Sequence, residues 1–393
     1  VLGSATPSIE TFGNAETGKY RLLRIMNRAD NAEMPRIRAL DMISARREGR
    51  VTGTFSVDLL EAVSERAERG EGTIIFQNRR GFSSFLICSD CGDIPQCKNC
   101  STSLTYHKAT GTLVCHYCGH TQNAYKSCGA CGSKNIQEIG SGTERIEDEL
   151  SEQLITRGLD PKIARLDLDT TRKKGSHRKI LSDFFEEKTD ILVGTQMVAK
   201  GLDFSRVTLV GVTNADLQLF TPDFRAGERT FQLLTQVAGR AGRSGESRGE
   251  VIIQTSRPES PAIYHSITGD YAALYHNEIK NRAKAQYPPF SRIVVIEFSG
   301  KDEIKVHDKC LKMMTLLPRH EDSLRFYGPI TPTLYLLRGY YRRLIVIKSI
   351  KDADKSGRKL KHYLDYAIAA YNDKYASSTE EYFIDVDSYS GAM

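Results

Sequence analysis

The sequence predicts an α/β protein in which a parallel-sheet domain carries a cysteine-rich insertion and is followed by a smaller α+β domain. Three observations support this prediction. Short β-branched runs alternate with helical stretches between Gly70 and Ser256, four C-x-x-C pairs follow the first of these runs, and the alternation changes after about Pro258. Because the alternation resumes after the cysteines, we interpret them as an insertion and not as a separate terminal domain.

Five runs in the first domain have the composition of buried strands: TIIFQN, KIARLDLD, DILVGTQ, RVTLVGVTNAD and GEVIIQTS. Helical stretches between them cover 144–157, 176–188 and 228–237. Strands that alternate with helices of this length need crossover connections, and such connections make the sheet parallel.

The last hundred residues predict a different arrangement. We expect a strand over 293–299, a helix over 302–317, a strand pair across 331–349, a helix over 353–373 and a strand over 381–389. This β-α-β-β-α-β order is the split βαβ, or ferredoxin-like, arrangement. Cys310 shares a helical face with apolar neighbours and is predicted to be a core residue. The segment 260–287 is predicted to be a helical connector, because it ends at Pro288-Pro289.

Composition restricts the class of protein. Hydrophobic residues make up 40% and charged residues 26%, and no apolar run approaches the length of a membrane span. We therefore expect a cytoplasmic protein with no membrane partner. A net charge of +6 permits a polyanionic partner without requiring one. The chain opens on Val1-Leu2-Gly3, as though at the end of a strand, and we expect it to be part of a longer protein.

Eight of the nine cysteines form the four pairs, which span 44 residues: Cys88/Cys91, Cys97/Cys100, Cys115/Cys118 and Cys128/Cys131. A C-x-x-C turn directs two thiolates at one centre, so four pairs predict two tetrahedral zinc sites with four sulfurs each. Glycines directly follow four of the cysteines, where positive φ would let backbone N–H groups turn toward sulfur; they are Gly92, Gly119, Gly129 and Gly132.

Two alternatives to zinc remain open. A disulfide framework needs an oxidising compartment, and the chain shows no secretory segment. An iron–sulfur cluster is also held by four cysteines and would be visible by its colour.

Gln236, Arg240 and Arg243 are spaced by four and three residues, which predicts that they share one helical face. Two guanidinium groups on one edge can stabilise charge in phosphoryl transfer, as arginine fingers do. The alternative is a basic helix end that complements its own dipole. A second candidate is the turn at Gly194-Thr195-Gln196, because α/β sheets place ligands at the carboxyl ends of parallel strands.

Three motifs carry a resemblance to a known family. GSATPS, GTQMVAKGLDF and QVAGRAGR, in that order, look like motifs III, V and VI of a superfamily 2 helicase. With NRRGF at 78–82, the eight-cysteine insertion, GTERIEDEL at 142–150 and YPPFSR at 287–292, the chain resembles the PriA family of replication-restart helicases, also called primosomal protein N′. The resemblance spans essentially the whole chain.

The resemblance implies roles for particular residues. The motif VI residues Arg240 and Arg243 would be the arginine fingers, and Gln236 would read the nucleotide state with Asp203. The other implied nucleotide contacts are Gly194, Thr195, Gln196 and Gly239; the implied DNA-coupling residues are Ser4, Thr6 and Lys200. One departure is Leu202, where the family usually has histidine, and this puts a DNA or coupling contact in doubt.

The resemblance also implies nested metal sites. The outer pairs would form site one, of Cys88, Cys91, Cys128 and Cys131; the inner pairs would form site two, of Cys97, Cys100, Cys115 and Cys118. Spacing supports the inner set independently, since fourteen residues separate its pairs, close to the roughly 15–20 of a zinc ribbon.

By the same resemblance, the chain is expected to comprise the end of a first RecA-like lobe (1–20), a second lobe (21–87 and 132–257), the zinc insertion (88–131), a connector (258–287) and an S10-like DNA-binding domain (288–393). Its parent would be an ATP- and Mg²⁺-dependent 3′-to-5′ DNA helicase in the bacterial cytoplasm and nucleoid. Expected partners are forked and single-stranded DNA, single-strand-binding protein, primosome assembly proteins and the machinery that loads the replicative helicase.

The chain lacks a convincing phosphate-binding loop. Gly13 to Tyr20 nearly matches one, but Tyr20 cannot replace the Mg²⁺-binding hydroxyl, and no buried strand precedes Gly13. Asp148-Glu149 is expected inside a helix, so it is no Walker B pair. We therefore expect this chain alone not to hydrolyse ATP.

Two other functions remain open. One is a non-catalytic zinc-ribbon adaptor that keeps a degenerate RecA-like lobe; a Walker A loop upstream in the native gene would exclude it. The other is a different superfamily 2 translocase with a coincidental zinc insertion. The C-terminal residues Arg338, Tyr340, Tyr341, Arg342 and Arg343 could stack on bases and hold phosphates, or be one exposed strand face.

Overall fold

The computed structural model describes most of the chain, and the structural statements below concern these residues: 1–25, 34–77, 85–98, 102–107, 110–115, 118–139, 143–167, 170–171, 175–199, 206–242, 249–318, 321–333, 335–337, 339–375 and 381–388. None of the helices in these ranges combines the length and apolar character needed to cross a bilayer.

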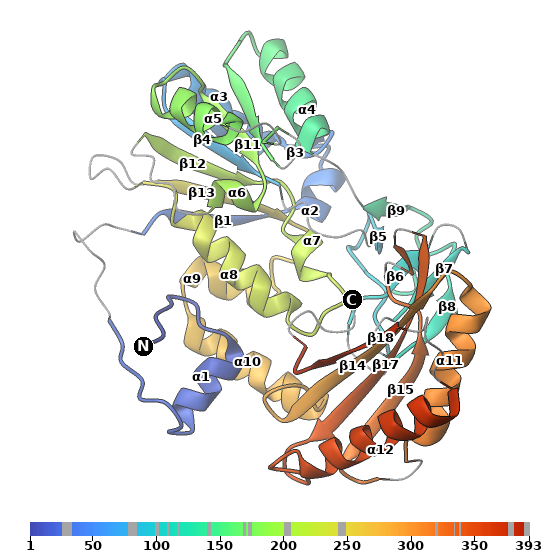
Figure 1. Cartoon of the computed structure of the whole chain (residues 1–393). Helices are drawn as coiled ribbons and strands as arrows, with labels where there is room; N and C mark the ends of the chain where they lie inside the picture. The colour runs from blue at the N-terminus through green and yellow to red at the C-terminus, as the bar shows by residue number, and fades with distance from the viewer. Residues whose placement is uncertain are drawn as a thin grey trace.

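A six-stranded sheet forms the first domain, and every neighbouring pair of its strands is parallel (Figure 1). The strand order is β1-β13-β12-β4-β11-β10. The strands are β1 (Arg36–Asp41), β4 (Gly72–Phe76), β10 (Ile163–Leu166), β11 (Ile191–Gly194), β12 (Val207–Val212) and β13 (Glu250–Thr255). All five predicted strands are present. The sixth, β1, was not predicted; it is a partly exposed edge strand that pairs with β13.

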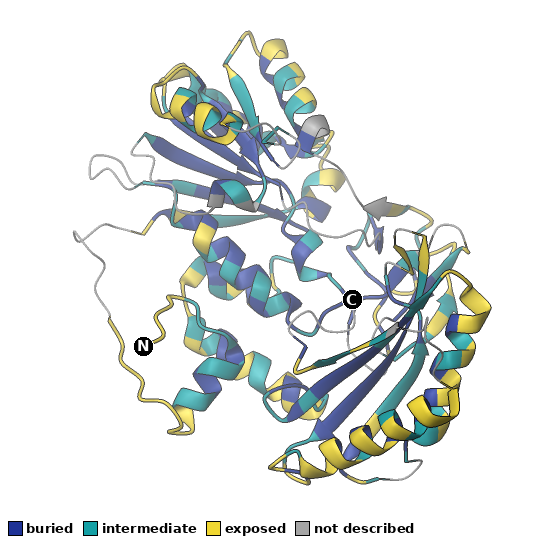
Figure 2. Ribbon diagram, viewed as in Figure 1, coloured by how far each residue is buried: buried dark blue, intermediate teal, exposed yellow. Residues whose placement is uncertain are grey.

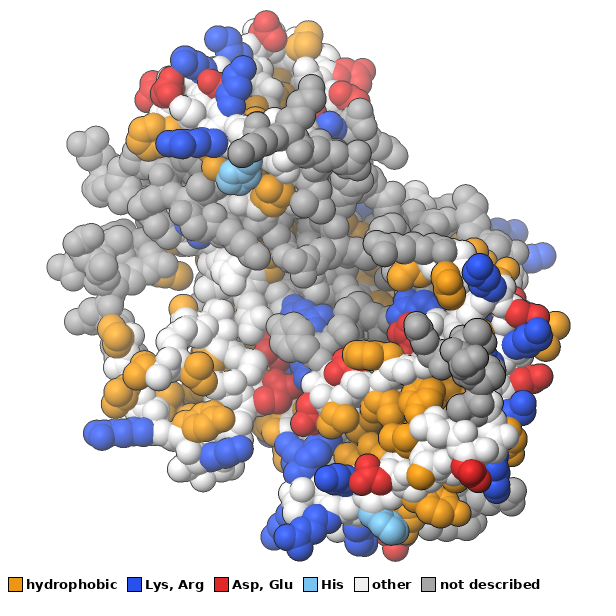
Figure 3. Space-filling view, viewed as in Figure 1, with side chains coloured by type: hydrophobic (Ala, Val, Ile, Leu, Met, Phe, Trp, Pro, Cys, Tyr) orange, Lys and Arg blue, Asp and Glu red, His pale blue; other side chains and the backbone are white. Residues whose placement is uncertain are grey.

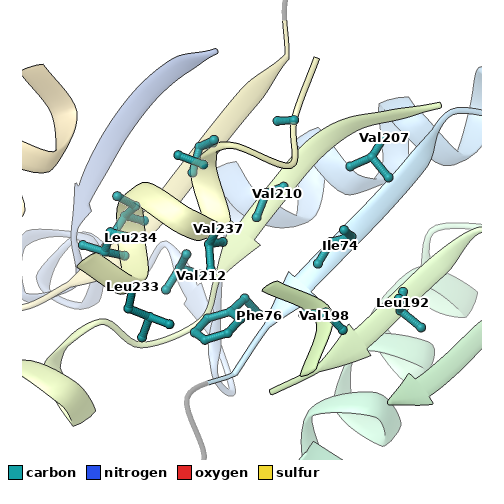
Figure 4. Close-up of a cluster of buried hydrophobic side chains, with 14 of the residues drawn as sticks. Ile74, Phe76, Leu192, Val198, Val207, Val210, Val212, Leu233, Leu234 and Val237 are labelled. Carbon is teal, nitrogen blue, oxygen red and sulfur yellow. The ribbon is translucent and has the colours of Figure 1, made fainter. Parts of the chain in front are cut away.

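Helices cover both faces of this sheet, which explains why its central strands are almost wholly buried (Figure 2). On one face lie α3 (Val57–Glu68) and α4 (Thr143–Thr156). On the other lie α5 (Ser176–Phe185), α6 (Gln196–Ala199), α8 (Ala226–Ala238) and α9 (Pro261–Thr268). Figure 4 shows this second core, where Leu234 and Val237 of α8 pack near Val212 of the sheet. Shorter elements complete the domain: α2 (Met42–Arg47), β2 (Val51–Thr52), β3 (Phe55–Ser56) and α7 (Asp216–Leu219).

The cysteine-rich insertion consists of two small antiparallel sheets that lie between the two domains (Figure 1). One pairs β5 (Phe85–Cys88) with β9 (Ile136–Ile139). The other contains β6 (Thr105–His107), β7 (Thr112–Val114) and β8 (Thr121–Asn123). Few apolar residues belong to the insertion itself, and its buried ones share clusters with the neighbouring domains.

The connector consists of two helices, α9 and α10 (Tyr271–Lys284), separated by Gly269 with φ +69°. The C-terminal domain follows as an antiparallel sheet with the strand path β15-β17-β14-β18. Its elements are β14 (Ser291–Gly300), α11 (Glu303–Leu316), β15 (Leu324–Ile330), β16 (Leu336–Leu337), β17 (Tyr340–Ile350), α12 (Arg358–Tyr375) and β18 (Glu381–Val386). Both helices pack on one face of this sheet, and the insertion packs on the other.

This strand order confirms the split βαβ arrangement, but one of its strands was not predicted. The expected pair across 331–349 is present as β16 with β17, but β16 has only two residues, and the longer β15 that also pairs with β17 precedes the expected range. Cys310 is fully buried in the core beneath α11, as predicted, and burial raises the pKa of its thiol to about 12.

The first residues form no strand. Residues 1–4 are irregular, so the expectation that Val1-Leu2 ends a strand is wrong. Helix α1 (Ile9–Glu16) follows, capped by Ser8, and packs its Phe12 ring against Tyr275 of α10 at a centroid distance of 4.7 Å.

Candidate metal centres and helicase motifs

Site one is assembled from both ends of the insertion. The thiol sulfurs of Cys88, Cys91, Cys128 and Cys131 all lie within 4.8 Å of one another. Cys88 Sγ and Cys131 Sγ are 3.6 Å apart, as are Cys91 Sγ and Cys128 Sγ. Four sulfurs at about 2.3 Å from a tetrahedral zinc would be about 3.8 Å apart. These residues therefore fit a Zn²⁺ ion.

The same distances exclude disulfides for these pairs, since a disulfide holds its sulfurs about 2.04 Å apart.

Each described C-x-x-C pair that precedes a glycine folds into the same turn, which we call a knuckle. The glycine N–H donates to the carbonyl of the first cysteine: Gly92 to Cys88 at 2.8 Å, Gly119 to Cys115 and Gly132 to Cys128, both at 2.9 Å. All three glycines have φ between +73° and +75°, as predicted. Gly129 does not share this conformation, because it lies inside the turn between Cys128 and Cys131 and not after it.

Backbone N–H groups in site one stabilise thiolate. Desolvation by burial raises the pKa of Cys88, yet N–H groups of Cys91 and Asp90 that point at its sulfur lower that pKa overall. Cys91 shows the opposite balance: desolvation and the neighbouring sulfurs raise its pKa to about 12. Four thiolates repel one another in this small space, and a bound dication would favour the deprotonated form of each.

Site one docks on the helicase lobe through polar contacts of its knuckles and, beside them, through a small apolar cluster in which Phe85, Ile87 and Ile94 pack against Phe220. The Arg47 guanidinium donates to the Asp90 carbonyl, and Arg257 Nε donates to the Gly92 carbonyl at 3.2 Å. The Asp90 carboxylate accepts from Ser133 and, at 3.0 Å, from Asn135, which ties the two knuckles together and lowers the pKa of Asp90.

Site two has three described members. The sulfurs of Cys97, Cys115 and Cys118 lie within 4.8 Å of one another, and Cys97 Sγ is 3.4 Å from Cys118 Sγ. Cys100, the expected fourth ligand, lies outside the described residues.

Site two docks on the C-terminal domain through apolar packing. Cys97 and Cys115 are buried in one cluster with side chains of the insertion and of the C-terminal sheet. The insertion contributes Leu104 and Leu113, and the sheet contributes Ile293, Val295, Ile330, Leu344 and Val346.

The motif V turn begins where β11 ends. Gly194 closes the strand, and a Cβ atom there would collide with Val198 and lie 2.7 Å from the Leu166 carbonyl, so only glycine fits. Thr195 follows and accepts a hydrogen bond from the Val198 N–H at 3.0 Å, which starts α6. The Gln196 side chain, Lys200, Leu202 and Asp203 lie outside the described residues.

Of the described motif VI residues, Gln236 lies on α8 and Arg240 lies beyond its end. Helix α8 ends at Ala238, with Gly239 as its C-cap, so Gln236 is exposed in the last helical turn. Arg240 lies in the turn beyond, where its N–H donates to the Val237 carbonyl at 3.0 Å. The prediction of a common face is therefore wrong for Arg240. Arg243 lies outside the described residues.

The motif III segment contacts α8. Ser4 Oγ accepts from the Thr6 N–H at 3.1 Å, and the Thr6 carbonyl accepts from Gln232 Nε2 of α8 at 3.2 Å. Gln232 precedes Gln236 by one helical turn. The structure thus joins motif III to the motif VI helix through a residue that the sequence analysis did not identify.

Known protein families match the three parts of this chain: the cysteine-rich insertion, the helicase lobe and the C-terminal domain. Family models match the PriA DNA helicase Cys-rich region at residues 97–122, the helicase conserved C-terminal domain at 136–245 and the primosomal protein N C-terminal domain at 283–389. The replication restart protein PriA of Bacillus subtilis is 42% identical over 367 residues, and that of Chlamydia pneumoniae is 40% identical over 354.

The chain belongs to the PriA family of replication restart proteins. The alignments cover 92% and 89% of this chain but only 45% and 46% of those two relatives, so the chain spans about half their length. Among solved structures, RecG bound to a three-way DNA junction gives a TM-score of 0.38 at 14% identity, covering 72% of this chain and 27% of that one.

The two near-matches to nucleotide-binding motifs have ordinary structural roles. Gly13 lies inside α1 and Lys19 follows that helix, so the near-match to a phosphate loop has the wrong geometry. Glu149 lies within α4 and accepts from the Thr54 N–H at 3.1 Å. Neither feature has the geometry of a phosphate-binding loop or of an acidic pair at a strand end.

The basic residues of the C-terminal hairpin are paired with carboxylates. Arg342 makes two 2.6 Å contacts to Glu297, and Arg343 is 2.6 Å from Glu303. These contacts disfavour a phosphate site for the two arginines, and the alternative of an exposed strand face does not hold for them either, because their side chains are only 14% and 11% exposed. Arg338 lies outside the described residues, as do the NRRGF run at 78–82 and the basic run 172–174.

Proposed function

We propose that this chain supplies the second helicase lobe, the zinc insertion and the C-terminal domain of an ATP-dependent 3′-to-5′ DNA helicase. The full protein would recognise stalled or abandoned replication forks and start primosome assembly on them. The observation that carries the proposal is the cysteine-rich insertion, which contacts a helicase lobe on one side and the C-terminal domain on the other.

In this proposal, Cys88, Cys91, Cys128 and Cys131 hold one Zn²⁺, and Cys97, Cys115 and Cys118 hold the second together with Cys100. The ions are structural: four sulfurs close each coordination shell and leave no position for a substrate. The insertion is too poor in apolar residues to fold on its own core, so the metals would fix its shape and make it a rigid wedge against the fork.

The nucleotide would bind between this lobe and the first lobe of the full protein. We propose Arg240 and Arg243 as the groups that stabilise charge on the γ-phosphate, with Gln236, Gly239, Gly194, Thr195, Gln196 and Asp203 completing this side of the site. Ser4, Thr6 and Lys200 would couple nucleotide state to DNA. Without a phosphate-binding loop of its own, the isolated chain would not hydrolyse ATP. We propose the domain bounds expected from the sequence: 1–20, 21–87 with 132–257, 88–131, 258–287 and 288–393.

The proposed partners are forked and single-stranded DNA, single-strand-binding protein, primosome assembly proteins and the loading machinery of the replicative helicase, in the bacterial cytoplasm. The family membership supports this set, since the matched relatives are named replication restart proteins.

An arginine substitution in the full-length protein tests the assignment. We expect Arg240→Ala to reduce ATP turnover at least about a hundredfold while DNA affinity stays within about tenfold, because a finger touches the nucleotide and not the strand. Arg66→Ala, in an ion pair of the same lobe with Glu250, is the control and should retain turnover. Equal losses of turnover and DNA affinity would contradict the assignment and favour the adaptor function.

A further inference from the structure

A buried cluster of charges joins α1, α8 and α10. Arg282 Nη2 of α10 donates to Glu228 Oε2 of α8 at 2.6 Å, and Arg282 Nη1 lies 3.2 Å from Glu10 Oε1 of α1. Arg225 Nη2, just before α8, is 2.9 Å from the same Glu10 oxygen. The side chains of Arg282 and Glu228 are only 2% and 4% exposed. Ionised groups this deeply buried are costly unless they are paired, so their mutual positions are tightly fixed.

One side of this cluster holds the motif III segment. Glu228 Oε1 accepts from Gln232 Nε2 at 3.2 Å and from the Ile9 N–H at 3.4 Å. Gln232 Nε2 also reaches the Thr6 carbonyl, and the Tyr271 hydroxyl of α10 donates to the Pro7 carbonyl at 2.8 Å. The segment 6–9 is therefore held by α8 and α10 together.

The other side reaches the C-terminal domain through stacked rings. Phe224 and Tyr287 stack with centroids 4.5 Å apart and planes 7° apart. Arg225 lies 4.2 Å from the Phe224 centroid, and Lys348 of β17 lies 3.8 Å from the Tyr287 centroid. A cation–π contact between desolvated groups stabilises both partners, so this stack ties the sheet to the cluster. Figure 3 shows acidic and basic side chains side by side where the connector meets the C-terminal domain.

The cluster lies on the helix that carries motif VI. Glu228, Gln232 and Gln236 are spaced by four residues and share one face of α8, with Gln236 about 12 Å along the helix from Glu228. A helix of this length moves as a rigid element. A displacement of the C-terminal sheet that reaches Glu228 would consequently also move Gln236 and the following turn with Arg240.

We propose that Glu228, Arg282 and the Lys348–Tyr287–Phe224–Arg225 stack form a positioning relay that transmits the placement of the C-terminal domain to the motif VI helix and the motif III segment. None of these residues is a catalytic residue, because each acts through α8. The inference rests on the proposed function for its catalytic consequence, namely that DNA held by the C-terminal domain stimulates ATP turnover.

The test compares ATP turnover by the full-length protein with saturating forked DNA and without DNA. Lys348→Met keeps the length of the side chain and removes its charge. We expect it to lower the stimulation by DNA about tenfold while the DNA-free rate changes less than about twofold. Glu228→Gln should lower the stimulation similarly, and the double variant should be no worse than either single variant, because both substitutions interrupt one relay.

Glu250→Gln is the matched control, since Glu250 also bridges two arginines, Arg38 at 2.9 Å and Arg66 at 2.8 Å, on the same lobe but away from the connector. It should keep the stimulation within about twofold. A purely structural role for the relay predicts instead that stimulated and DNA-free rates fall together and that the two substitutions act additively. Either result would overturn the proposal.

Hydrogen exchange provides a second readout that needs no catalysis. In the full-length protein, Lys348→Met should speed amide exchange at least about threefold in residues 6–16 and 226–238, remote from the substitution. Unchanged exchange there would overturn the relay. A wild-type protein without DNA-stimulated turnover would instead contradict the proposed function, and the exchange result would still decide the relay.

Discussion

Site one and site two fold into the same cysteine knuckles, yet they dock on different domains through different interactions. The knuckles of site one contact the helicase lobe through arginine side chains that bind backbone carbonyls; Cys88 and Cys128 are buried and Cys131 is exposed. The small apolar cluster beside them, of Phe85, Ile87, Ile94 and Phe220, does not include these cysteines. Site two contacts the C-terminal sheet through leucine, isoleucine and valine side chains, with Cys97 and Cys115 buried among them. The cysteines of site two thus belong to a large apolar core, whereas those of site one lie beside a smaller one and make polar contacts to the lobe.

This difference predicts which metal matters more for stability. The polar contacts of site one lie at a partly exposed surface and contribute little, and the apolar cluster beside them is small; the larger apolar cluster of site two removes more hydrocarbon from water. We therefore expect site two to hold the C-terminal domain in place and site one to orient the insertion on the lobe.

The largest effect should come from removing one ligand of each site. Cys118 and Cys91 are matched, because both are half-buried second cysteines of a pair. We expect Cys118→Ser to lose one zinc and lower the melting temperature by roughly 5–10 °C, and Cys91→Ser to lose one zinc with less than half that shift. Elemental analysis and calorimetry check this. Equal shifts would show that the two sites support the fold alike.

The contribution of the apolar contacts around site two can be measured separately from that of its metal ligands. Leu344 and Ile345 are adjacent buried residues on opposite faces of β17, toward the insertion and toward the helices respectively. Replacing either by Ala should cost about 2–4 kcal/mol of stability. Only Leu344→Ala should also speed zinc release from site two to a chelator, by at least about fivefold. If Ile345→Ala speeds release as much, release reports global unfolding and not docking.

Sequence patterns were enough to predict most strands of the parallel sheet and the cysteine turns. Buried parallel strands such as β12 read as unbroken apolar runs, and C-x-x-C spacing specifies a knuckle locally. Strand β1 was missed because Arg36 and Arg38 break its apolar pattern at a partly exposed edge. Strand β15 was missed because Gly328-Pro329 resembles a turn.

The long-range contacts could not be predicted. The buried ion pair of Glu228 and Arg282 joins residues 54 apart in sequence, and each reads by itself as an ordinary charged residue on an amphipathic helix. The end of α8 was predicted to within one residue, at 237 against Ala238, yet the four-residue spacing still assigned Arg240 to its face although Gly239 caps the helix before it.

The polar dock of site one should show a smaller effect. Arg257→Met removes the hydrogen bond to the Gly92 carbonyl and the ion pair with Asp93 at 3.8 Å. Because Arg257 is partly exposed, we expect zinc release from site one to speed up only about threefold, with the melting temperature unchanged within about 2 °C. Stopped-flow release to a colorimetric chelator measures this. A stability loss as large as that of Leu344→Ala would contradict a minor contribution of this polar contact.

The smallest effect should be a pH dependence of stability that arises from Glu321 in the C-terminal domain. Hydrogen bonds from Ser323, Lys359 and Tyr363 lower the pKa of Glu321 to about 2. A carboxyl whose folded pKa is lowered stabilises the fold above its unfolded pKa, and this contribution disappears as pH falls through the folded value. We expect Glu321→Gln to reduce the loss of stability between about pH 4.5 and pH 2 relative to wild type. Parallel acid-unfolding curves for the two proteins would contradict this.

Stepwise zinc removal tests the central comparison most directly. Zinc should be counted per chain while a chelator is added, with the melting temperature followed in parallel. We predict two zincs per chain that leave in two phases: a fast phase with little loss of stability, removed by Cys91→Ser, and a slow phase that undocks the C-terminal domain, removed by Cys118→Ser. One zinc per chain, iron in its place, or a single phase with one loss of stability would contradict two sites that dock differently.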